Sequence, residues 1–104
     1  MDAYLINLDY QRAIEQADAL EELASGLKDM AEEDVSKLMK DIKLAWEGDN
    51  SEAYLAKVGI FQQNVQKTSA KMSNIAATVR QMAENIRDAE LENLRLAQER
   101  TYAE

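Results

Sequence analysis

The sequence contains no cysteine, no histidine and no proline, and only three glycines in 104 residues. Without cysteine and histidine, the chain cannot form disulfides or the usual zinc, haem and iron–sulfur sites, and it lacks the Ser-His and Cys-His pairs of nucleophilic enzymes. Proline interrupts helices most strongly, so little in this chain stops a helix once it has begun. We therefore expect long helices, no metal and no cofactor.

Basic residues are also scarce, with 12 Lys and Arg against 20 Asp and Glu and a formal net charge of −8. This balance disfavours nucleic acid and anionic membranes as partners. The longest uncharged stretch, Val58 to Gln66, is too short to span a bilayer. Met1 to Asp9 lacks a basic region before an apolar run, so we expect synthesis in the cytoplasm without a signal peptide.

The second half of the chain has an apolar residue at alternating steps of four and three, with one threonine in the series. This spacing predicts a helix over about residues 51–98 that packs lengthwise on another helix. The sequence leaves open whether the tail beyond it is ordered or mobile. The positions are Tyr54, Val58, Phe61, Val65, Thr68, Met72, Ile75, Val79, Met82, Ile86 and Ala89.

The first half predicts a helix over about residues 7–45, but its pattern is less regular. An extra four-residue step after Ala31 is a stutter, which locally unwinds a supercoil. A second face runs through Val35, Met39 and Ile42 to Trp46. The main seam consists of Ile6, Tyr10, Ala13, Ala17, Leu20, Ala24, Leu27 and Ala31, followed by Val35, Leu38, Ile42 and Ala45.

The two helices are separated by a short turn at residues 46–50. Gly48 is suited to close the first helix, and Asp49 with Glu52 resembles a capping box that opens the second. The sequence thus predicts an all-α fold with a single domain over 1–104, an antiparallel helix-turn-helix hairpin. Residues 1–48 carry 12 acids and five bases, whereas no acid occurs from Ala53 to Ala83, and this contrast favours antiparallel alignment.

A hairpin of two helices buries too little apolar surface to be stable alone. We therefore expect two hairpins to pair into a four-helix bundle dimer. The residues expected in the hairpin and dimer seam are Leu20, Leu27, Leu38, Ile42, Tyr54, Val58, Phe61, Val65, Met72, Ile75, Val79 and Met82.

Trp46-Glu47-Gly48, at the turn of a hairpin of about 100 residues, resembles the WXG-motif, ESAT-like family of type VII secretion substrates in Gram-positive bacteria. Tyr54, eight residues after Trp46, matches the large residue that the family places there. The resemblance implies secretion, or display at the cell surface, and a groove near Trp46 that binds the secretion ATPase. It also implies a Tyr-x-x-x-Asp/Glu export signal, for which this chain has Ile86 and Glu90, with isoleucine in place of the aromatic residue.

Several functions remain open. The chain is an exported dimer of itself or of a similar hairpin, a chaperone or targeting partner of the helical domain of an LXG-type toxin, or an unrelated cytosolic coiled-coil adapter. Enzyme activity is the least favoured class, because the acids, including Glu32 to Asp34, are expected on solvated faces. The polar run from Gln62 to Gln66 is expected on the outer face of its helix.

Overall fold

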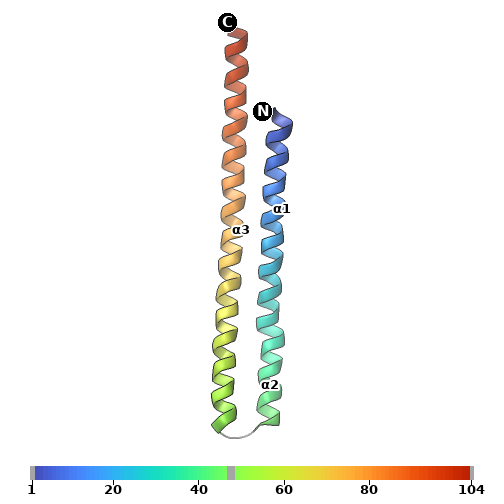
Figure 1. Cartoon of the computed structure of the whole chain (residues 1–104), viewed down its shortest axis with the longest axis vertical. Coiled ribbons are helices and arrows are strands. Elements are labelled where there is room, and N and C mark those ends of the chain that lie inside the picture. The colour runs from blue at the N-terminus through green and yellow to red at the C-terminus, as the bar shows by residue number, and fades with distance from the viewer. Residues whose placement is uncertain (1, 47–48, 104) are drawn as a thin grey trace. The chain divides into compact units, whose positions relative to one another are not determined.

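The computed structural model describes residues 2–46 and 49–103, and the chain is an all-α helical hairpin (Figure 1). Helix α1 spans Ala3–Asp29, a π-helical turn spans Met30–Asp34, and α2 spans Val35–Ala45. Helix α3 spans Asp49–Ala103. The glycine expected to close the first helix, Gly48, lies outside the described residues.

Both predicted helices extend further than the apolar pattern indicates. Helix α1 begins at Ala3 rather than near residue 7, because an Asp2 carboxylate oxygen accepts a hydrogen bond from the Leu5 N–H at 2.9 Å and caps the first turn. Helix α3 continues past residue 98 to Ala103. Its last turns contain ion pairs of Arg95 with Glu92 and Glu99, which support a helix without tertiary contacts.

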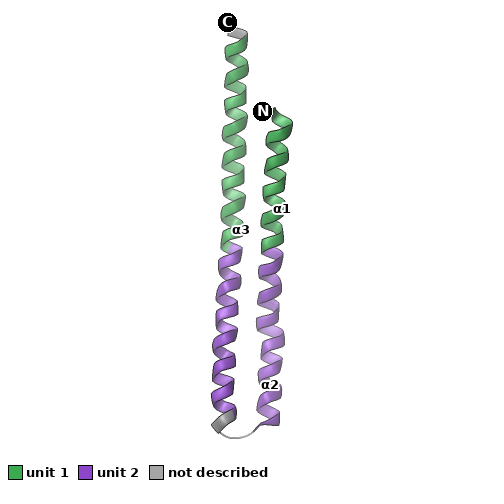
Figure 2. Cartoon of the chain, viewed as in Figure 1, with its two compact units in different colours: residues 1–20, 74–104 green, residues 21–73 purple. Residues whose placement is uncertain are grey.

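The chain divides into two compact units, coloured in Figure 2. Unit 1 consists of residues 1–20 and 74–104, and unit 2 consists of residues 21–73. In unit 1, Arg80 contacts Asp18 and Arg87 lies over Tyr10, so the two segments run antiparallel. In unit 2, Ser69 bonds to Ala24 and Trp46 contacts Tyr54, so its segments are antiparallel as well.

Small residues form the buried interior of both units. The first arm of the hairpin consists of α1, the π-helical turn and α2, and the second arm is α3. The buried positions on the first arm include Ala17, Ala24 and Ala31, and those on α3 include Ser69, Ala76 and Ala83. Each set repeats every seven residues, which keeps its members on one face of the helix. Alanine and serine allow two helix backbones to approach closely, and the Ser69 hydroxyl donates a 2.6 Å hydrogen bond to the Ala24 carbonyl.

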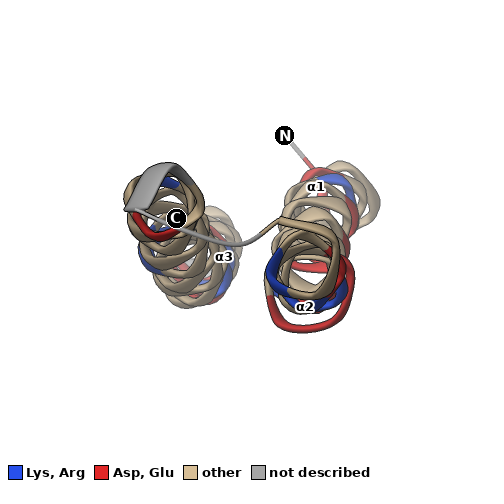
Figure 3. Cartoon of the chain, turned by 90° about the horizontal axis from the view of Figure 1, so that it is seen from below, with Lys and Arg blue, Asp and Glu red and all other residues tan. Residues whose placement is uncertain are grey.

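An ion pair between charged side chains joins the arms of unit 1. Arg80 Nη2 donates to Asp18 Oδ1 at 2.7 Å, with both side chains partly exposed. Lys57, Lys67 and Lys71 on α3 are exposed, and Figure 3 shows acidic and basic residues on the helices. An exposed pair contributes about 0–1 kcal/mol, so charge guides the alignment of the arms less than the small-residue interior does.

Candidate functional site

The turn end of unit 2 presents two aromatic side chains together. Trp46 follows α2 in an extended conformation, and its N–H donates to the Ile42 carbonyl at 2.8 Å. The Trp46 and Tyr54 rings meet edge to face, with centroids 5.8 Å apart. Trp46 is 55% exposed and Tyr54 is 47% exposed, so this pair is an accessible aromatic surface.

The seam predicted for the second helix lies only partly inside the hairpin. Val58, Val65, Met72 and Val79 are half-buried, whereas the alternate members of the series face solvent. Phe61, Ile75 and Met82 are each more than half exposed, although every one is a large apolar side chain. Helix α3 therefore has an inner column of small buried residues, Ser69, Ala76 and Ala83. It also has an outer column of large exposed residues, Phe61, Ile75 and Met82.

The predicted seam residues of the first arm divide in the same way. Leu20, Leu27 and Ile42 are half-buried, but Leu38 is 49% exposed. In unit 2, Leu27 lines a shallow hollow together with Phe61 and Val65 from α3. In this hollow, Leu27 of the first arm and Phe61 of α3 therefore contribute to one surface, together with the polar residues Asn64 and Thr68.

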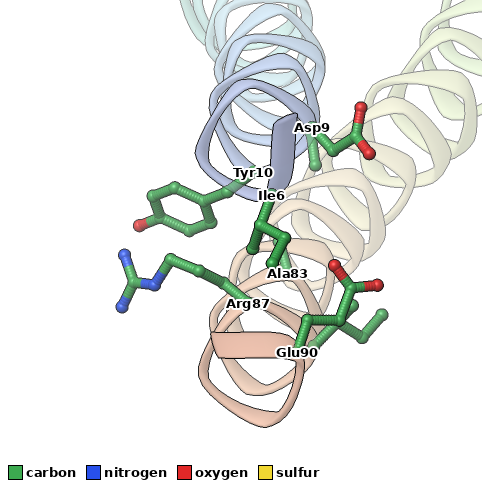
Figure 4. Close-up of a pocket in the computed structure, with 8 residues that line it drawn as sticks. Ile6, Asp9, Tyr10, Ala83, Arg87 and Glu90 are labelled. Atoms are coloured by element: carbon green, nitrogen blue, oxygen red, sulfur yellow. The ribbon is translucent and has the colours of Figure 1, made fainter. Parts of the chain in front are cut away.

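Ile86 and Glu90, the predicted export signal, line one cavity in unit 1 (Figure 4). Ile6, Asp9 and Tyr10 of α1 complete the cavity together with Ala13, Ala83 and Arg87. In Figure 4 the Tyr10 and Arg87 side chains point to one side, and the Asp9 and Glu90 carboxylates point to the other. The two signal residues are thus part of a surface to which both arms contribute.

Arg87 anchors the basic side of this cavity. Its guanidinium carbon lies 4.2 Å from the centroid of the Tyr10 ring, within the range of a cation–π interaction. Its Nε donates to Asp88 Oδ1 at 3.1 Å, and this hydrogen bond is the main cause that raises the pKa of Arg87 above its usual value. The arginine is therefore held in its charged form beside the tyrosine.

Sequence reasoning missed Gln62, which it placed on the outer face of the helix. Gln62 is half-buried, and its Nε2 donates to the Ala31 carbonyl at 2.6 Å and to Ser36 Oγ at 2.8 Å. Ala31 lies in the π-helical turn on the opposite arm of unit 2, and Ser36 lies in the first turn of α2 directly after it. The signal in the sequence was the stutter after Ala31, because the structure places the π turn at that position.

The described residues offer exposed surfaces suited to binding. Among residues 2–46 and 49–103, no group of three or more acidic side chains is arranged to hold a metal ion. The residues that the structure brings together are apolar and aromatic, with one arginine and two acids at the open end. Such an arrangement is suited to the recognition of another protein surface.

Comparison with known proteins shows to which family the chain belongs. The model of the WXG100 family, described as proteins of 100 residues with WXG, matches residues 5–91. The chain belongs to the WXG100 family. The search of curated proteins and the search of solved structures found no match.

WXG100 proteins are small helical proteins of the kind secreted by type VII systems, and are not known as enzymes. Family members typically pair with similar helical partners. The hairpin of this chain, and the position of Trp46 beside the turn, agree with membership of the family. Within the described residues of this WXG100 chain, no helix has a stretch long and apolar enough to cross a membrane.

Proposed function

We propose that this WXG100 protein is a non-catalytic substrate of a Gram-positive type VII secretion system and travels as a folded dimer. The observation that carries the proposal is the outer column of α3, where Phe61, Ile75 and Met82 remain more than half exposed. Large apolar side chains that stay exposed on a helix are typical of a protein–protein interface. A second hairpin laid on this surface gives a four-helix bundle.

Charge favours a second copy of the same chain as the partner. The first 48 residues carry 12 acids and five bases, and the acid-free stretch of α3 carries Lys57, Lys67 and Lys71 on its exposed side. The acidic arm of one copy therefore complements the basic stretch of another. A similar hairpin or the helical domain of an LXG-type toxin is the alternative partner.

Sedimentation of the chain at low micromolar concentration tests the partner. We expect a well-folded species of twice the 11.8 kDa chain mass. A well-folded monomer contradicts the dimer. A molten chain that becomes ordered only with an LXG domain contradicts self-pairing and supports the targeting-partner alternative.

For recognition by the secretion ATPase, we propose that Trp46 acts together with Ile86 and Glu90. Trp46 and Ile86 are each more than half exposed, so they present apolar surface to a partner. Glu90 lies one helical turn after Ile86 and lines the same cavity, where it adds a negative charge. In unit 1, Ile86 and Glu90 thus present the mixed apolar and acidic surface that the Tyr-x-x-x-Asp/Glu signal of the family provides, while Trp46 presents a separate aromatic surface in unit 2.

Export in a host with a type VII system tests these residues. We expect Trp46→Ala, and the pair Ile86→Ala with Glu90→Gln, to lower the amount in the medium while the amount in cells persists. Ile60→Ala and Glu84→Gln are the matched controls, because both residues are exposed and lie outside the cavity. Unchanged export of the variants contradicts this recognition site.

A further inference from the structure

The sequence after Ala31 supports two different faces for α2. A regular α-helix directs Val35, Leu38, Ile42 and Ala45 toward α3, and the alternative face consists of Val35, Met39, Ile42 and Trp46. In the structure Val35 is buried and Met39 is half-buried, but Leu38 is 49% exposed. Unit 2 has therefore adopted the second face, and a Cβ built on Gly59 of α3 lies 3.9 Å from Met39 Cε.

The π-helical turn is the cause of this choice. The Val35 N–H donates to the Met30 carbonyl, five residues back, so the turn accommodates one residue more than an α-helical turn. The helix face that buries Ala17, Ala24 and Ala31 then continues through half-buried Met39 to the partly exposed Trp46, with a single step of eight among steps of seven. Without the π turn, α2 is rotated by about 100°, the angle of one helical residue, and Trp46 leaves this face.

Gln62 is placed to hold the π turn. Backbone hydrogen bonds span five residues in the π turn and four residues in the α-helix that follows. Where the spacing changes, one backbone carbonyl is left without a backbone N–H partner. Ala31 O, the carbonyl that follows Met30 O, accepts a hydrogen bond from Gln62 Nε2 at 2.6 Å. The second N–H of the same amide donates to Ser36 Oγ at 2.8 Å, so one side chain connects the π turn with the start of α2.

We propose that Gln62 is a positioning residue for Trp46, acting across the hairpin through the π-helical turn. A carbonyl only accepts hydrogen bonds, so the amide orientation of Gln62 is fixed by Ala31 O. Val35 and Ile42 belong to both faces of α2, so the packing of these two residues does not select between them. The proposal takes its importance from the proposed function, in which Trp46 is recognised, but its test reads the environment of Trp46 alone.

The test replaces Gln62 by an apolar side chain of similar size. Trp46 is the only tryptophan, so its near-UV circular dichroism and its quenching by acrylamide report on one site. We expect Gln62→Leu to remove most of the Trp46 near-UV signal and to increase quenching, with little change in far-UV helix signal. Gln63→Leu, the same change at the exposed neighbouring position, leaves both signals unchanged.

Deletion of Glu33 separates positioning from general stability. Removing one residue from the π turn gives a regular α-helix in which the residues after it keep their orientation, so Trp46 stays beside Tyr54 and Gln62 is no longer required. We therefore expect Gln62→Leu to change the Trp46 signals in the full-length chain and to leave them unchanged in the deletion background. Equal loss in both backgrounds, no loss in either, or loss of the signal by the deletion alone overturns the proposal. Export assays do not enter this result, so failure of the proposed function is distinguishable from failure of this inference.

Discussion

The inner and outer columns of α3 are neighbours in sequence but differ in size and burial. Ser69, Ala76 and Ala83 are buried, whereas the residue immediately before each, Thr68, Ile75 and Met82, is exposed. Because adjacent helical residues are separated by about 100°, the two columns face different surroundings. The comparison teaches that small residues bring the two arms together, while the large residues Ile75 and Met82 stay exposed, where we propose that a second molecule binds.

The strongest way to break this comparison is to place charge on the outer column. We expect Ile75→Asp with Met82→Asp to weaken dimerisation by about 3 kcal/mol or more, roughly 100-fold in Kd, because unpaired charges are then buried in the interface. Sedimentation equilibrium measures the effect. Ala70→Asp with Ala77→Asp adds the same charge at exposed positions on the opposite side of α3, and equal weakening there argues against an outer interface.

Enlarging the inner column tests the close approach of the arms. Ala76 is fully buried, and we expect Ala76→Leu to lower the free energy of unfolding by about 1–3 kcal/mol, because the added side chain forces the helices apart. Urea unfolding followed by circular dichroism measures this change. The exposed neighbour supplies the control Ala77→Leu, for which we expect almost no loss.

The buried hydroxyl of the inner column has a smaller expected effect. Ser69→Ala removes the 2.6 Å hydrogen bond to the Ala24 carbonyl, and we expect a loss of about 0.5–1.5 kcal/mol in the free energy of unfolding. Ser25→Ala, at an exposed helical position, shares the gain in helix propensity but breaks no such bond. A more stable Ser69→Ala variant shows that the hydroxyl is not needed between the arms.

The C-terminal end of α3 sharpens the comparison of the two columns, because ion pairs within the helix support this end. The hydrogen bond from Arg95 lowers the pKa of Glu92 below its usual value near 4.5. A lowered folded pKa stabilises the helix fully above the usual value, and this contribution is lost as the pH falls through the folded pKa. We expect the protection factors of amides 92–101, which correct for the intrinsic slowing of exchange in acid, to fall on acidification. The dependence becomes weaker in Glu92→Gln, and an unchanged pH dependence contradicts this assignment.

The hairpin itself was predictable because hydrophobic period and turn residues are local signals. The helical spacing and the composition around Trp46 indicated two helices and one turn, as the structure has them. The ends of the helices were harder to predict, because Asp2 and Arg95 act through polar contacts that a hydrophobic pattern does not contain. A pattern of large residues also cannot show which side of α3 packs against the first arm.

The π turn explains the rest of the difference between prediction and structure. The stutter after Ala31 was visible, but the π turn that replaces it carries a hydrogen bond from Gln62, which lies 31 residues further along the chain. The sequence therefore placed Leu38 and Ala45 in the main seam, whereas the structure selects Met39. A polar side chain that bonds to a distant backbone carbonyl carries no periodic signal. Whether Ile86, Glu90 and the outer column bind partners stays a prediction.

The small-residue interior has a thermodynamic consequence. No large side chain is completely buried among the residues that the structure describes. The heat capacity change of unfolding scales with the apolar area that becomes exposed, so separating the arms of one chain contributes little to it. For the dimer that we propose, we therefore expect the heat-capacity step in a calorimeter to include the surface shared between molecules, and the melting temperature to rise with protein concentration.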